Sequence, residues 1–140
     1  MALVLDASVA SRWLSKDESE GDRAYANAIL ERLTLPDERA YVPCHWSLEM
    51  ANVAIRGEHK GFIEWGMVEL FLEILEDIDF HIDLEASTRA MTDLTDLARH
   101  YRLTSYDAAY LELAQRLSVP LATLDKDLRR AAEKAGVPLI

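Results

Sequence analysis

The alternation of short apolar segments with longer amphipathic segments most constrains how this chain of 140 residues can fold. Residues 2–5 are continuously apolar and end at Asp6, a pattern typical of a strand that is buried on both faces of a parallel sheet. Further strand-like segments lie at residues 40–42, 78–82, 121–123 and 137–140. Because helical patterns separate these strands, the order predicts right-handed crossovers and a mostly parallel sheet covered by helices on both faces.

Helical periodicity connects the strands, at residues 19–33, 45–56, 62–75, 84–101, 104–117 and 126–134. Gly57 and Gly136 are expected to end the helices that precede them. Residues 62–75 are apolar around most of the helix circumference, which predicts a helix that is central or shared with another chain. Residues 78–82 alternate in polarity, as a half-buried edge strand does. At this length we expect one α/β/α domain over residues 1–140.

The cysteine count and the apolar runs indicate the compartment. Cys44 is the only cysteine, so an intrachain disulfide and a zinc site made of thiolates are excluded, and we expect a small buried apolar residue there. The apolar run at the N-terminus is too short for a signal peptide, and no run approaches the roughly 20 residues of a membrane span. A soluble protein of the reducing cytoplasm is therefore expected.

The charge is strongly acidic, because 25 Asp and Glu oppose 15 Lys and Arg and give a formal net charge of −10 at pH 7. Non-specific affinity for nucleic acid comes mainly from Lys and Arg, so this balance argues against a protein that simply coats nucleic acid. It indicates either a solvated acidic surface or carboxylates that are collected to bind a metal.

Three aspartates follow predicted strands or begin predicted helices. Asp6 follows the first strand, Asp107 lies in the first turn after Thr104, and Asp125 follows residues 121–123. In parallel sheets, ligands bind beyond the carboxyl ends of the strands, so these acids are placed where a site is expected. Each also has a structural explanation: Asp6 and Asp125 as helix N-caps, and Asp107 with Thr104 as a capping box.

Glu49 cannot be explained as a cap, because it lies well inside the helix predicted for residues 45–56. With His45, Asn52 and Arg56 it forms one polar stripe along that helix. The stripe either faces solvent, where Glu49 pairs with His45 or Arg56, or faces the strand ends, where Glu49 joins the three aspartates. The sequence leaves both interpretations open.

Four carboxylates in one cleft would repel one another and raise the pKa of at least one of them, unless a cation compensates. Mg²⁺ and Mn²⁺ prefer carboxylate and water oxygens, and Mg²⁺ also binds substrate phosphates. Because the metal reverses the local sign of the charge, an acidic pocket is compatible with a polyanionic substrate. The net charge of −10 therefore does not exclude nucleic acid as a substrate.

Four segments carry a family resemblance, in the order VLDASV, HWSLEMANV, LTSYDAAYLELA and PLATLDKDL. They resemble the four acidic blocks of PIN domains, and over nearly the whole chain the sequence is most similar to the short VapC-type ribonuclease toxins of toxin–antitoxin pairs. The resemblance implies a sheet of four or five parallel strands between helices. It also implies a Mg²⁺- or Mn²⁺-dependent endoribonuclease that cleaves cellular RNA, and a homodimer that a small cognate antitoxin inhibits.

The resemblance assigns the catalytic positions to four acids: Asp6, Glu49, Asp107 and Asp125. The three aspartates would be metal ligands, while Glu49 would act directly or through water. Ser8 and Thr123 match polar positions that support the site. Asp127 is a further acid, either an outer-shell ligand or a favourable charge at a helix start, and we favour the second role.

The chain departs from the family in two respects. Residues 54–56 are Ala-Ile-Arg where a more aliphatic continuation is expected. Basic residues that would guide RNA are also few, and most of them are individually expected to be ordinary solvated surface. Arg12, Arg56 and Lys126 are the candidates for contact with RNA. The full set of basic candidates is Arg12, Lys16, Arg56, Lys60, Arg102, Lys126, Arg129 and Arg130.

Two other protein classes that use an Asp after the first strand of an α/β sheet fit this sequence less well. Haloacid-dehalogenase-like phosphatases need a second Asp two residues after the first, where this chain has Ser8, and receiver domains need an acidic pair near the first strand. The four histidines share no spacing that marks a zinc site. The main alternative is a non-catalytic PIN-like interaction module that acts through a dimer or antitoxin interface, for which the apolar residues 62–75 would serve.

Overall fold

The computed structural model describes residues 1–15 and 19–140. In these residues four parallel strands form one sheet in the order β3-β2-β1-β4. The strands are β1 (Ala2–Leu5), β2 (Arg39–Pro43), β3 (Asp79–Asp83) and β4 (Leu121–Ala122). The predicted parallel sheet is confirmed, and β3 lies at its edge, as the alternating pattern of residues 78–82 predicted.

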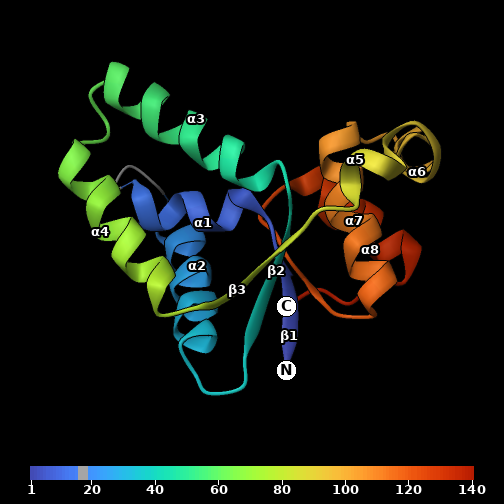
Figure 1. The fold of residues 1–140 in the computed structure, drawn as a ribbon, viewed down its shortest axis with the longest axis horizontal. Helices are drawn as coiled ribbons and strands as arrows, with labels where there is room; N and C mark the ends of the chain where they lie inside the picture. The colour runs from blue at the N-terminus through green and yellow to red at the C-terminus, as the bar shows by residue number, and fades with distance from the viewer. Residues whose placement is uncertain (16–18) are drawn as a thin grey trace.

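Helices cover the sheet on both faces, with α1 to α4 to the left of the strands in Figure 1 and α5 to α8 to the right. Helix α7 packs on β1 and β2. None of the helices in the described part of the chain has the length and apolar character that crossing a membrane requires. The predicted α/β/α architecture is confirmed. The helices are α1 (Ala7–Leu14), α2 (Glu20–Leu33), α3 (Trp46–His59), α4 (Trp65–Glu76), α5 (Ala86–Arg89), α6 (Thr95–Tyr101), α7 (Ser105–Leu117) and α8 (Lys126–Ala135).

The core is centred on β1, whose Leu3, Val4 and Leu5 have no exposed surface. Strand β1 lies between β2 and β4, so it has a hydrogen-bonded neighbour on each side and helices above and below. Helix α7 supplies a continuous run of buried residues from Ala108 to Ala114. The carboxyl end of β1 is therefore held from several directions, and that end carries Asp6.

Two predicted elements differ in the structure. Residues 137–140 were expected to be a strand but make only one parallel bridge, between Leu121 and Leu139, because Pro138 has no N–H to donate to a ladder. The helix expected over residues 84–101 is divided by a π-helical segment, η1 (Ala90–Leu94). Near this segment Ala86, Leu94 and Ala109 form a small separate cluster, which Cys44 contacts while only partly buried.

Helix α4 is not a central helix. It begins at Trp65, three residues later than predicted, and Phe71 is its one fully buried residue. Trp65, Leu70 and Leu72 are each exposed by half or more. One side of this helix therefore packs on the core, while Trp65, Leu70 and Leu72 form apolar surface that the described part of the chain leaves exposed.

Gly57 does not end α3, which continues to His59 and stops before Gly61, a residue with a positive φ of 79°. The amides of Phe62 and Ile63 both donate to the carbonyl of Gly57, at 2.8 and 3.2 Å. A Cβ at Gly57 would lie 2.7 Å from Cγ1 of Ile63 and closer still to its Cδ1. The glycine is therefore required because the chain folds back against the helix at this position, and the prediction that it ends the helix was wrong.

Replacing this glycine tests the close approach. Ala is favoured over Gly in a helix by about 1 kcal/mol, but the overpacked Cβ in Gly57→Ala should outweigh that gain and lower the free energy of unfolding by about 1–3 kcal/mol. Gly66→Ala in α4 is the matched control, because a Cβ there meets nothing within 4 Å. Urea unfolding of both variants measures the difference, and equal stabilisation of the two would contradict it.

Candidate active site

Asp6 lies at the carboxyl end of β1 and at the N-cap position of α1, but its side chain makes no capping hydrogen bond. Its carboxylate is buried, with 4% of the residue exposed. Oδ2 accepts two hydrogen bonds of 2.6 Å, from the hydroxyl of Ser8 and from the hydroxyl of Thr123. Capping therefore does not explain this residue, since its side chain is held by two neighbouring hydroxyls instead.

The two hydroxyls are oriented by backbone amides. The amide of Leu124 donates to Ser8 Oγ at 2.9 Å, and the amide of Asp125 donates to Thr123 Oγ1 at 3.0 Å. A hydroxyl carries a single proton, so both protons are directed to Oδ2 of Asp6. Among the described residues none donates to Oδ1, which leaves this oxygen available to a ligand.

Asp125 and Asp107 both begin helices, as predicted. Oδ1 of Asp125 accepts from the amide of Leu128 at 2.8 Å, which makes Asp125 the side-chain cap of α8. At the start of α7 the hydroxyl of Thr104 accepts from the amide of Asp107 at 3.1 Å. That bond uses the backbone of Asp107, and its carboxylate has a further side-chain hydrogen bond with Thr104. Capping therefore accounts for the position of both residues but not for all their oxygens.

Glu49 faces the strand ends while keeping a local partner. Tyr110, which is fully buried on α7, donates its hydroxyl to Oε1 of Glu49 at 2.7 Å. His45 Nε2 lies 3.1 Å from the same oxygen. Both interpretations of the stripe thus hold in part, because Glu49 joins the aspartates and also contacts His45. Sequence analysis missed Tyr110, although its place three residues after Asp107 puts both on one face of α7.

Electrostatic interactions connect the four carboxylates. Burial, followed by repulsion from Asp125, Asp6 and Glu49, raises the pKa of Asp107 to about 6. Burial also raises the pKa of Asp6, with smaller contributions from Glu49 and Asp125, while its two hydroxyl partners act in the opposite direction. The structure therefore brings the four acids named from the sequence into one interacting group.

Tyr110 is placed to be a permanent donor. Burial and the nearby charges of Asp6 and Glu49 raise the pKa of its hydroxyl. The proton therefore stays on Tyr110 and fixes the Oε1 side of Glu49.

The donor set fits a hard divalent cation. Carboxylate oxygens are the protein ligands that Mg²⁺ and Mn²⁺ prefer, and the uncommitted oxygens belong to Asp6, Asp107 and Asp125. Within residues 1–15 and 19–140, no three acidic, histidine or cysteine side chains lie close enough to enclose an ion by themselves. The arrangement therefore suits an ion that keeps several water ligands, as Mg²⁺ commonly does.

Comparison with known proteins gives the family. The family model of the PIN domain matches residues 3–134. The chain belongs to the PIN-domain family. This PIN domain is 30% identical over 130 residues to Ribonuclease VapC3 of Pyrobaculum aerophilum, covering 91% of this chain and 92% of that protein. The family resemblance stated from the four acidic segments is confirmed.

Solved structures show the same fold. The crystal structure of PAE2754 from Pyrobaculum aerophilum matches 94% of the PIN domain chain and 87% of its own, with a TM-score of 0.65 at 19% identity. That of FitAcB from Neisseria gonorrhoeae matches 99% of this chain and 96% of its own, with a TM-score of 0.58 at 18% identity. The PIN fold therefore extends over nearly the whole chain.

Several residues named from the sequence lie outside the group of four acids. Asp127 is exposed and accepts from Arg130 at 2.7 Å. Arg129 donates to the carbonyl of Thr123 at 2.9 Å and so supports the end of β4. Lys126 is exposed at the start of α8. Lys16 lies outside the described residues.

The pKa of Asp107 predicts how stability depends on pH and on cations. The metal-free folded PIN domain holds this proton more tightly than the unfolded chain, because the pKa rises from 3.8 to about 6. The contribution of Asp107 to stability is therefore full below about pH 3.8 and is lost as the pH rises through about 6. Mg²⁺ or Mn²⁺ should raise the melting temperature more at pH 7 than at pH 5.

Thermal unfolding in EDTA and in excess cation measures this difference. Asp107→Asn should remove most of the cation effect at pH 7, whereas Asp96→Asn, which changes an exposed acid on α6, should keep it. Equal cation effects at the two pH values in the wild type would contradict the prediction.

Proposed function

We propose that this PIN domain is a Mg²⁺- or Mn²⁺-dependent endoribonuclease, and that residues 1–140 form one domain that acts as the toxin of a toxin–antitoxin pair by cleaving cellular RNA in the cytoplasm. The observation that carries the proposal is the group of four carboxylates, in which burial and then repulsion from the other three acids raise the pKa of Asp107 to about 6. The similarity to Ribonuclease VapC3 supports RNA as the substrate. The excess of negative charge in the site explains why a cation is needed before a phosphodiester can approach.

The side chains of the site are oriented before substrate arrives. When bound, Mg²⁺ or Mn²⁺ supplies activation of water and neutralisation of the charge that develops on the phosphate. Asp6 presents Oδ1, because Ser8 and Thr123 fix its other oxygen. Glu49 presents Oε2, because the hydroxyl of Tyr110 occupies Oε1. Groups fixed in this way need little reorganisation during the reaction, which is the main source of electrostatic catalysis.

The proposed antitoxin has a suitable surface on the same domain. An apolar groove of about 280 Å³ lies between α1, α3 and α4, and its lining includes Trp46, Met50, Trp65 and Leu72. Helix α4 carries several Glu residues and no basic residue. We propose that an antitoxin segment with an apolar face and basic flanks occupies this groove, since an exposed apolar groove usually marks a partner surface.

The proposed homodimer would use a different surface. Leu84 and Met91 are exposed by 72% and 85% and flank α5 in the sequence. Figure 1 shows α5 on the opposite side of the strands from α3 and α4, which line the groove. Dimerisation there would leave the groove open to the antitoxin. The non-catalytic interaction module remains the second candidate function, and the exposed groove is the observation that favours it.

Neutralising the carboxylate of Asp6 tests the proposed nuclease activity. Asp6→Asn keeps an oxygen that can accept from Ser8 and Thr123, so the chain should fold, while metal-dependent RNA cleavage should fall by about a hundredfold or more. Asp96→Asn is the matched control and should cleave at the wild-type rate. Circular dichroism checks the fold, and mapping of new RNA ends after induced expression measures cleavage. Full activity in excess EDTA, or equal cleavage by wild type and Asp6→Asn, would contradict the proposal.

Two leucines of α4 test the groove. Leu72 lines it and Leu70 does not, although both are exposed by more than half. Leu72→Asp should abolish copurification with a co-expressed antitoxin and leave RNA cleavage intact, because a buried unpaired charge is strongly unfavourable. Leu70→Asp should still copurify. Light scattering of the free protein shows whether the groove instead joins two copies, in which case Leu72→Asp would be monomeric.

A further inference from the structure

The polar stripe of α3 continues beyond the candidate active site. Glu49, Asn52, Arg56 and Lys60 are spaced by three, four and four residues, which places them on one face of the helix. At about 1.5 Å per residue, Arg56 lies roughly 10 Å and Lys60 roughly 16 Å along the axis from Glu49. One helix face therefore leads from an active-site carboxylate to two cations.

A second polar stripe on α1 faces the first. It begins at Ser8, whose hydroxyl binds Asp6, and continues through Ser11 and Arg12. Ser11 donates to the carbonyl of Ser8 at 3.1 Å. Helices α1 and α3 pack together, and residues of both stripes line one groove, in which Asn52 lies one helical turn from Glu49.

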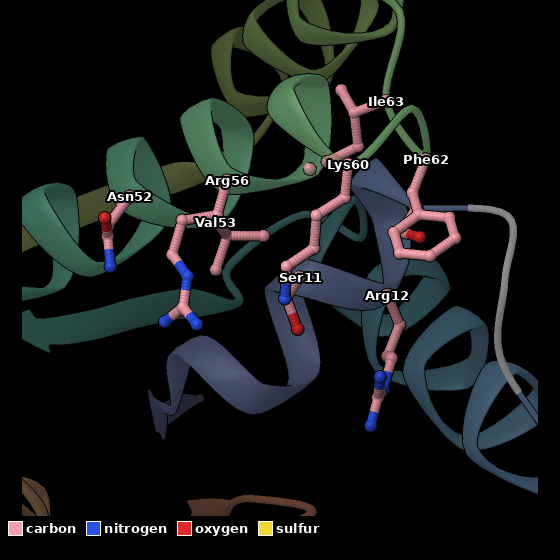
Figure 2. Close-up of a pocket in the computed structure, with 10 residues that line it drawn as sticks. Ser11, Arg12, Asn52, Val53, Arg56, Lys60, Phe62 and Ile63 are labelled. Atoms are coloured by element: carbon pink, nitrogen blue, oxygen red, sulfur yellow. The ribbon is translucent and has the colours of Figure 1, made fainter.

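This groove contains a pocket of about 330 Å³, which Arg12, Asn52, Arg56, Lys60 and Phe62 help to line. Figure 2 shows Arg56 and Lys60 extending from α3 toward α1, with Asn52 pointing the same way. The basic head groups are therefore directed into the groove.

Most arginines in the described part of the chain pair with a carboxylate, whereas Arg56 and Lys60 do not. Within the described residues neither of them is in an ion pair. Arg12, on the opposite wall, lies 3.5 Å from Asp22. In a chain with a net charge of −10, two cations beside an acidic site provide a local attraction for a polyanion. Arginines that do pair with carboxylates are Arg32, Arg39, Arg89, Arg116 and Arg130.

Phe62 adds an aromatic surface at the outer end of the groove. Phe62 is 53% exposed and directly follows Gly61, the glycine with a positive φ. Proteins that bind single-stranded nucleic acid combine a cationic groove with aromatic side chains on which bases stack. A paired base cannot stack on a side chain in this way, so the combination favours a single strand over a duplex.

We propose that the groove between α1 and α3 binds single-stranded RNA to one side of the scissile phosphate, with Arg56 and Lys60 on backbone phosphates and Phe62 stacked on a base. The inference rests on the proposed ribonuclease function, since it names how that site holds its substrate. Asn52, between the carboxylates and the cations, offers an amide to a phosphate or ribose oxygen.

Binding in EDTA tests the groove without cleavage. Fluorescence anisotropy of the full chain with a labelled single-stranded RNA of about 12 nucleotides, and with a duplex of the same length, is measured over a series of salt concentrations. For Arg56→Ala with Lys60→Ala, the slope of log K against log salt should decrease by about 1.4, because two phosphate contacts are lost. Phe62→Ala should weaken single-strand binding about fivefold or more at an unchanged slope, and leave duplex binding unaltered.

Arg99→Ala with Lys134→Ala is the matched control, because it removes the same charge from α6 and α8. This control should bind RNA as the wild type does. Equal losses in the two double variants would overturn the proposal, since the attraction would then come from net charge alone. Unaltered binding by the groove double variant, or no RNA binding by the wild type, would also overturn it.

Cleavage in Mg²⁺ or Mn²⁺ separates this proposal from the nuclease itself. Loss of groove contacts should raise KM and leave kcat unchanged. If the wild type cleaves RNA and the groove double variant has unchanged KM and RNA binding, the proposed RNA groove would be overturned while the proposed nuclease activity would stand. If RNA binding depends on Arg56 and Lys60 but the wild type cleaves no RNA, the result would support the proposed groove and contradict the proposed nuclease activity.

Discussion

The hydrogen bonds that hold buried Asp6 are the interaction on which this structure depends. A carboxylate taken out of water is unstable unless polar partners replace the water, and here two charge-assisted bonds of 2.6 Å do so. Ser8 comes from α1 and Thr123 from the end of β4, and the Asp6 amide donates to the carbonyl of Ala122. The same few atoms therefore join the central strand, its neighbour and the first helix. Stability and the geometry of the site cannot be separated at this point.

The other three carboxylates of the site add negative charge close to the buried carboxylate of Asp6, where further negative charge is unfavourable. Glu49 lies on α3, Asp107 on α7 and Asp125 at the start of α8. Besides burial, repulsion within this group raises the pKa values of Asp6 and Asp107. The fold tolerates this repulsion because the core beneath, from β1 to α7, is continuous and apolar. Tyr110 belongs to both parts, since its ring is buried in the core and its hydroxyl fixes Glu49. Local instability of this kind is common where a protein is organised to bind a ligand.

Much of the fold was predictable because its determinants are local. The apolar run of residues 2–5, the capping residues Thr104 and Asp125, and the glycine at position 136 define strand and helix ends within a few residues of sequence. The positions of Asp6, Asp107 and Asp125 were also predictable, since parallel strands bring their carboxyl ends to one edge. The pattern left the direction of Glu49 open, and only the family resemblance placed it with the aspartates. Features that depend on distant contacts were missed. The bond from Tyr110 to Glu49 joins residues 61 apart, and Gly57 is required by Ile63 rather than by a helix end. The position of α4 was left open between the core and an interface, because an apolar circumference is equally compatible with both.

Helix α3 separates two surfaces of opposite character. Asn52, Arg56 and Lys60 line the basic pocket on one face, while Met50, Ala54 and Ile55 line the apolar groove on the other. A single turn of this helix therefore contributes to both, but through different side chains. Substitutions at the apolar positions can change the groove proposed for the antitoxin without altering the charges of Arg56 and Lys60. The architecture thus allows the proposed partner surface to change in sequence while the chemistry beside Asp6 stays the same.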